Sequence, residues 1–220
     1  MSLVTKARQR RLGIRQARSS NSANLWVLQS PTAESPVTLS GDLRMKLFYY
    51  CEGDPTILST EYKERALEIP DGVDTVVADA MVTLVDRSVK AFAIDDGSMR
   101  SKENVDALSV VCRDSLVVIS TRDFCRFAMR IRNWQFAISA YHRSRGSDLG
   151  PVAQQIEAVV RRRGKTTLGE VMRSQGPIHP AVVIGATVLA LRNRVISSDM
   201  DANPWSSHTK LLRARHDFGR

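Results

Sequence analysis

Apolar and polar residues follow helical and strand-like periods in the first part of the chain. Between residues 41 and 50, apolar side chains recur at positions i, i+4 and i+7, namely at Leu43, Leu47 and Tyr50. This spacing places them on one face of a short helix that ends near Asp54-Pro55. We therefore expect a half-buried helix here.

The next segments carry strand patterns. Residues 66–69 predict a short strand closed by the turn residues at 70–72. Residues 75–85 and 88–94 are β-branched and largely apolar on either side of Asp86-Arg87. This arrangement predicts an antiparallel hairpin with long, mostly buried strands.

A helix, a strand and a second helix are predicted after the hairpin. Ser101 is a suitable N-cap for a helix that runs to about Cys112, and residues 116–119 form a short apolar run typical of a buried strand. Residues 121–141 carry apolar side chains on one side and arginines on others, as expected for a long amphipathic helix. A hairpin followed by helix, strand and helix predicts an α/β layer architecture.

The composition changes at residues 144–151, which are polar, contain glycine and end in Pro151. This segment is typical of a linker, and Pro151 suits the first turn of a following helix. Thr166 or Thr167 caps a short second helix, and residues 178–191 form an apolar third helix. Residues 194–212 then predict two short strands around a turn, so three helices and a hairpin indicate a winged helix.

The chain is basic, with 32 Lys and Arg against 23 Asp and Glu and a net charge of +9. This balance favours polyanions, above all nucleic acid, although a solvated cationic surface explains the charge alone equally simply. The N-terminal segment has no apolar core typical of a secretory signal, and no run is long enough to span a membrane. We expect a basic flexible arm at 1–36, an α/β domain at 37–145 and a winged-helix-like domain at 150–220.

Cysteine and histidine patterns argue against a metal site built on these residues. The three cysteines lie in apolar runs without CxxC spacing, and the four histidines are scattered. The cysteine usage fits a reducing, intracellular compartment.

Residues 41–55, Ala78-Asp79-Ala80 and the strand Lys90–Asp95 resemble the catalytic half of the TnsA family. These proteins are the endonuclease subunits of heteromeric transposases and have a restriction-endonuclease-like α/β fold followed by a winged helix. The C-terminal segment 191–201 is similar to the end of the family's last helix and its wing, so the resemblance covers about residues 40 to 212. It implies a cytoplasmic protein of a prokaryotic cell, or of its phage or mobile element.

The family's layout brings acidic groups from a helix and two strands together with a lysine. Such groups hold Mg²⁺, which activates water and neutralises charge on the scissile phosphate. Aligned at Asp54-Pro55, the helix carboxylate falls at Arg44, the strand aspartate at Asp79, the acid or amide at Ala93 and the lysine at Asp95. The resemblance therefore implies one retained catalytic position of four, with no intact catalytic site and no cofactor.

Two arrangements of these positions are open. Arg44 beside Asp79 predicts an ion pair in which a fixed cation replaces the metal. Alternatively, Asp79 with Asp95 or Asp96 forms a displaced site that holds Mg²⁺. Asp42 lies about 200° around the helix from Arg44, so its side chain should point away from Asp79.

The exposed cations are candidates for contacts to DNA phosphates. They lie in the N-terminal arm, at the end of the first helix of the second domain, and near the predicted wing: Arg8, Arg10, Arg11, Arg161, Arg162, Arg163, Lys165, Arg192, Arg194, Lys210, Arg213 and Arg215. Cations at a helix C-terminus also stabilise the helix without DNA. The third helix lacks base-reading side chains, so we expect it to be core or a protein-binding surface.

The leading expectation is a non-catalytic, DNA-binding accessory subunit of a transposition complex. By resemblance it would contact DNA, the strand-transferring transposase and an ATPase regulator. The alternatives are an active Mg²⁺-dependent DNA endonuclease with a displaced site, and a regulatory or interaction protein of a phage or mobile element on the same fold.

Overall fold

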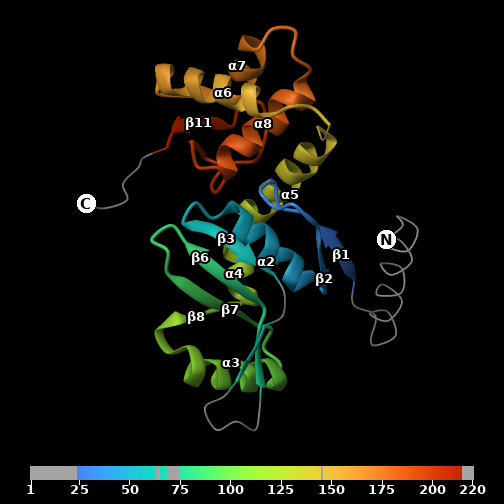
Figure 1. The fold of residues 1–220 in the computed structure, drawn as a ribbon, viewed down its shortest axis with the longest axis vertical. Coiled ribbons are helices and arrows are strands. Elements are labelled where there is room, and N and C mark those ends of the chain that lie inside the picture. Colours follow the sequence, from blue (N-terminus) through green and yellow to red (C-terminus); the bar gives the residue numbers. More distant parts are fainter. Residues whose placement is uncertain (1–23, 63–64, 69–74, 145, 215–220) are drawn as a thin grey trace.

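The computed structural model describes residues 24–62, 65–68, 75–144 and 146–214 as a mixed α/β protein (Figure 1). Its N-terminal unit contains a four-stranded sheet in the order β3-β6-β7-β8. The strands are β3 (Ile57–Glu61), β6 (Ala80–Leu84), β7 (Val89–Asp95) and β8 (Leu116–Ser120). The first three are antiparallel, and β8 is parallel to β7 because α3 (Met99–Cys112) connects them.

The two faces of this sheet contribute to separate cores. α2 (Asp42–Gly53) packs over one face, where its buried Leu47 and Phe48 join Val82 and Phe92. On the other face Leu108 of α3 packs with a second, smaller cluster, which includes Ala91 and Ala93. The predicted turn at residues 86 and 87 is confirmed, but the first strand of the hairpin, expected at 75–85, is divided at Asp79 into separate strands at 75–78 and 80–84. The short helix ends at Gly53, close to its expected end.

Two further ribbons flank the sheet. β4 (Arg65–Glu68) pairs with β5 (Thr75–Ala78), and β1 (Leu25–Leu28) pairs with β2 (Val37–Ser40). The first 23 residues lie outside the described structure, but residues 24–36 do not form the flexible arm that the sequence predicted. Backbone pairing of β1 with β2, and burial of Leu28 in the core, hold this segment in place.

The helix predicted at residues 121–141 consists of two helices. α4 (Thr121–Arg126) begins with a capping box formed by Ser120 and Asp123, and α5 (Ala128–Arg143) begins after Phe127. Phe124 of α4 and Trp134 of α5 are both buried, so each helix contributes an aromatic side chain to the core. Similarly, the cap of α3 is Ser98, not Ser101, because the Ser98 hydroxyl accepts the Ser101 backbone N–H.

The C-terminal unit has the order α6 (Gly150–Arg163), β9 (Lys165–Thr167), α7 (Leu168–Ser174), α8 (Pro180–Arg192), β10 (Ile196–Ser198) and β11 (Lys210–Arg213). The three strands form an antiparallel sheet in the order β10-β11-β9. β9 lies between α6 and α7 and was not predicted from the sequence. Thr167 caps α7 through a capping box with Glu170, as one of the two predicted caps.

α8 lies in the interior, as predicted for an apolar helix. It packs against α5 and α6, and none of its residues from 181 to 192 is exposed. Its residues join those of α2 and of the four-stranded sheet in one continuous hydrophobic cluster, so the two units share a core. Within the described residues, no helix combines the length and apolar character needed to cross a membrane.

Candidate functional site

Arg44 and Asp79 meet where α2 crosses the sheet. Arg44 lies in the first half of α2, and Asp79 occupies the break between β5 and β6. The Arg44 Nε donates to Asp79 Oδ1 at 2.9 Å, and the side chains are 30% and 12% exposed. The ion pair predicted from the sequence is therefore confirmed.

The second oxygen of Asp79 is also occupied. Its Oδ2 accepts the backbone N–H of Ile94 at 2.8 Å, while the Asp79 N–H donates to the Phe92 carbonyl at 2.9 Å. Asp79 therefore ties β7 to the break between β5 and β6. Each carboxylate oxygen already has a donor, and one of these donors is a cation.

The structure corrects the predicted places of Ala93 and Asp95. On β7, Phe92 and Ile94 belong to the core on the α2 side, whereas Ala93 packs with Leu108 on the α3 side. Successive residues of a strand point to opposite faces, so Ala93 and Asp95 face away from Arg44 and Asp79. The β7 side chains nearest the ion pair are thus apolar.

Asp95 and Asp96 stabilise the loop before α3. Asp95 Oδ1 accepts the Gly97 N–H at 2.8 Å and the Ser101 hydroxyl at 3.1 Å, and Asp96 Oδ1 accepts the Ser98 N–H at 2.8 Å. Hydrogen bonds from the side chain and backbone of Ser98 lower the pKa of Asp96. The contacts of Asp95 and Asp96 are thus with this loop and not with Asp79, and within the described residues no group of three His, Cys, Asp or Glu could hold a metal ion.

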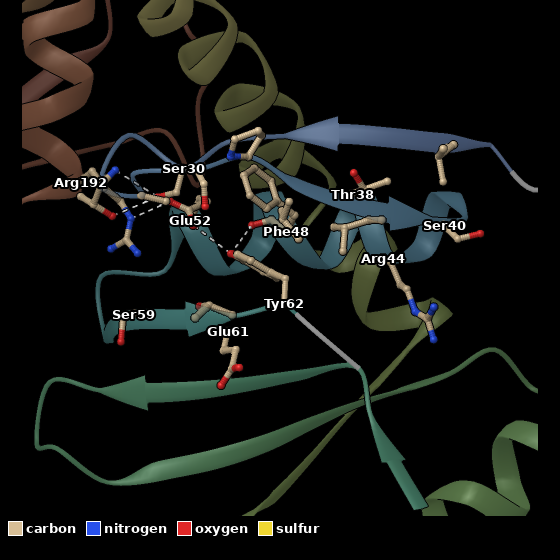
Figure 2. Close-up of a pocket in the computed structure, with 18 residues that line it drawn as sticks. Ser30, Thr38, Ser40, Arg44, Phe48, Glu52, Ser59, Glu61, Tyr62 and Arg192 are labelled. Carbon is tan, nitrogen blue, oxygen red and sulfur yellow. Dashed lines mark hydrogen bonds and ion pairs between the residues drawn. The ribbon is translucent and has the colours of Figure 1, made fainter. Parts of the chain in front are cut away.

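A cavity of about 670 Å³ opens beside Arg44 (Figure 2). The loop between β1 and β2, helix α2 and strand β3 enclose it, and Arg44 and the Glu52–Arg192 pair lie at its opposite ends. Much of its lining consists of hydroxyl side chains, with Phe48 and Tyr62 between them. This lining can offer hydrogen bonds to a polar ligand, and Glu61 adds a carboxylate between the charged groups at the two ends.

Glu52 is the centre of a buried polar network. Arg192 Nε donates to Glu52 Oε2 at 2.7 Å, and the two side chains are 3% and 1% exposed. The Ser30 hydroxyl donates to the same oxygen at 2.7 Å, and the Tyr62 phenol to Oε1 at 2.9 Å. Burial and the nearby Glu52 raise the pKa of Tyr62 well above its usual value, so Tyr62 remains a proton donor.

Two of the predicted DNA contacts, Arg192 and Arg194, lie at or beside this network. Arg192 also donates to the Ile57 carbonyl at 3.2 Å, so its guanidinium is enclosed by protein. Arg194 Nε donates to the Pro55 carbonyl at 3.1 Å, and its terminal nitrogen contacts the Ile57 carbonyl. Both arginines join the C-terminal unit to the end of α2. Arg192 is buried and presents no surface to phosphate, whereas Arg194 is half-exposed.

A second bridge between the units is centred on Arg130 of α5. Its guanidinium donates to Asp54 Oδ2 at 2.9 Å and to Asp201 at 2.8 and 2.6 Å, and it lies over the Tyr50 ring at 5.5 Å. Burial lowers the pKa of Arg130, but the hydrogen bond and charge of Asp201 outweigh this effect and raise it. Asp54 therefore has a structural role in addition to ending α2.

The other predicted cations of the C-terminal unit are exposed. Arg161, Arg162 and Arg163 form the last turn of α6, Lys165 begins β9, and Lys210 and Arg213 lie on β11. Arg161 pairs with Glu157 in the same helix, and Lys210 lies 4.0 Å from Asp199. The remaining predicted contacts, Arg8, Arg10, Arg11 and Arg215, are outside the described residues.

Glu52 and Arg130 were not identified from the sequence. A signal for Glu52 was present, since it is a carboxylate on the buried face of a helix otherwise lined by Phe48 and Cys51. A buried carboxylate requires a partner, but its partner is 140 positions away. Comparison of the chain with protein-family models and with curated proteins finds no match.

Proposed function

We propose that this protein is a DNA-binding, non-catalytic subunit of a transposition complex, built on a TnsA-like scaffold. The carrying observation is the Arg44–Asp79 ion pair, in which an arginine nitrogen lies 2.9 Å from the aspartate where the resemblance implies Mg²⁺. A fixed cation neutralises Asp79 but cannot activate water. The scaffold is retained without its hydrolytic chemistry.

The order of elements supports this scaffold. Helix α2, three antiparallel strands, a connecting helix and a parallel fourth strand follow one another in an order compatible with a restriction-endonuclease-like fold. The C-terminal order of helix, strand, two helices and two strands agrees with a winged helix.

A role in binding DNA and partner proteins fits the remaining features of the chain. A net charge of +9 favours DNA, and the resemblance supplies the partners, a transposase subunit and an ATPase regulator in a prokaryotic cell or its mobile element. An active endonuclease is disfavoured because Ala93 and Asp95 face away from Asp79.

The test combines cleavage and binding by the purified full chain. Supercoiled plasmid incubated with Mg²⁺ or Mn²⁺ should remain intact, while gel-shift binding to duplex DNA should weaken steeply as salt increases. Metal-dependent nicking that disappears in Asp79→Ala would establish an enzyme instead. Absence of DNA binding at low salt, with retained capture of the transposase or ATPase, would favour the interaction-protein alternative.

A further inference from the structure

We infer that the cavity beside α2 binds an extended peptide of a partner protein in which apolar and basic residues alternate. The peptide adds a strand to the free edge of β3, with apolar side chains toward Phe48 and a basic side chain toward Glu61. This inference goes beyond the proposed function and does not depend on DNA binding.

The cavity runs along strand edges and not over one face of a sheet. All four residues of β2 line it, and so do residues 59–62, at and just after the end of β3. Because successive residues of a strand point to opposite faces, a cavity in contact with every one of them lies at the edge. β2 pairs only with β1, and β3 is the first strand of its sheet, so these edges are the unpaired ones. The cavity volume of about 670 Å³ is in the range of sites that enclose a ligand.

The backbone of β3 can bond to a peptide at this edge. In an antiparallel pair, every second residue directs its N–H and C=O away from the partner strand. Within the described structure, no backbone–backbone hydrogen bond outside the β3–β6 ladder involves residues 59–61. An added strand pairs with such groups, and this is how β-strand addition provides affinity for a peptide.

The inner and outer sides of the cavity differ in chemistry. The inner side consists of side chains that belong to the core or pack against it: Val37, Leu39, Phe48 and Tyr62. The outer side consists of exposed polar side chains of the same two strands: Thr38, Ser40, Ser59 and Glu61. Tyr62 and Glu61 accordingly point to opposite sides of β3 (Figure 2). A peptide strand in this cavity therefore needs apolar residues at every second position and polar residues between them.

Glu61 favours a basic residue at one of the polar positions. Its side chain is exposed, and among the described residues no Lys or Arg nitrogen lies within 4.0 Å of its carboxylate. The other carboxylate of the cavity, Glu52, is paired with Arg192, and the charge of Arg44 is balanced by Asp79. Opposite charges on neighbouring strands attract, so a lysine or arginine across from Glu61 stabilises the added strand.

The experiment uses the full chain and a fluorescein-labelled synthetic peptide in which valine and lysine alternate. Fluorescence anisotropy measures its affinity for wild type, for Glu61→Lys and for the control Glu103→Lys, which makes the same charge change at an exposed site on α3. A second peptide has glutamate in place of lysine. Two further lysine peptides carry methyl groups on the backbone nitrogens of either the valines or the lysines, and so each lacks the N–H groups that face one neighbouring strand. Thermal melts establish that both variants are folded.

Glu61→Lys should weaken binding of the lysine peptide about tenfold, because an attractive cross-strand pair becomes repulsive, and it should strengthen binding of the glutamate peptide. Glu103→Lys should change neither affinity by more than about twofold, since solvent screens a distant exposed charge. At least one methylated peptide should lose its binding, and bound lysine peptide should slow hydrogen exchange at residues 59–61.

Equal effects of the two charge changes would overturn recognition by Glu61. Full binding of both methylated peptides would overturn strand addition. A wild-type protein that does not bind the lysine peptide would overturn the inference as a whole, while the proposed function would still stand or fall on the cleavage and gel-shift measurements.

Discussion

At the scale of single residues, Arg44 decides the chemistry of the centre. Its guanidinium and the Ile94 N–H occupy both oxygens of Asp79, so the carboxylate is balanced without an ion from solution. The pair is partly exposed, and such pairs contribute about 1 kcal/mol or less. The cation therefore contributes little to stability, and its main consequence is that Asp79 already has a positive charge beside it.

Replacement of this cation by an acid should create affinity for a metal. In Arg44→Glu two carboxylates face each other without a cation, so the variant should be less stable than wild type. Millimolar Mg²⁺ or Ca²⁺ should restore about 1 kcal/mol, the gain expected when a ligand exceeds its dissociation constant several-fold. Thermal unfolding with and without the ion measures this gain.

Arg44→Gln is the matched control, since it also removes the cation but adds no carboxylate. Its stability should not respond to the divalent ion. An equal response of both variants, or of neither, would contradict the location of a former metal site between residues 44 and 79.

At the scale of secondary-structure elements, the contact of α8 with the end of α5 depends on Gly185. A Cβ at this position would lie 2.9 Å from the Cβ of Ser144 and 3.5 Å from Leu149. Ser144 is itself fixed by a hydrogen bond from its hydroxyl to the Tyr141 carbonyl. The apolar helix therefore needs glycine here for close approach.

Gly185→Ala should consequently destabilise the protein, although alanine is the better helix former. Overpacking of a closed interface costs about 1 to 3 kcal/mol, more than the gain in helix propensity. Gly150→Ala is the control, because the added Cβ would lie at an ordinary 3.4 Å from Asp148. Urea unfolding that shows the two variants equally stable would contradict tight packing of α8.

At the scale of the whole molecule, the two units behave as one body. One hydrophobic cluster runs from the β1–β2 ribbon to β11, and the Glu52–Arg192 and Arg130 bridges join the units beside it. We expect calorimetry to record a single unfolding transition, with equal calorimetric and van't Hoff enthalpies.

Glu52→Gln should make the unfolding of the two units less cooperative. The substitution leaves the Arg192 charge buried without its counterion, and breaking such a pair costs about 3 kcal/mol or more. The transition should move to lower temperature and broaden or divide. Glu61→Gln on exposed β3 is the control with the same chemical change, and an equally small effect of both substitutions would show that the units do not depend on the buried pair.

Local features were predictable from the sequence where local physics governs them. The turn at residues 86 and 87, the capping of α7 by Thr167, the burial of α8 and the Arg44–Asp79 pair follow from periodicity, capping preference and the alignment of segments. The break at Phe127 was missed because it depends on where two aromatic side chains enter the core.

By itself, the sequence determined the order and type of most elements, the basic charge, and the pairing of Arg44 with Asp79. Only the tertiary structure decided that Ala93 and Asp95 face α3, because the pleat of a strand sends neighbouring residues to opposite faces. It likewise decided that Arg192 is buried while Arg213 is exposed. A cation's exposure depends on whether folding brings it a partner, and for Arg192 that partner is 140 residues distant in sequence.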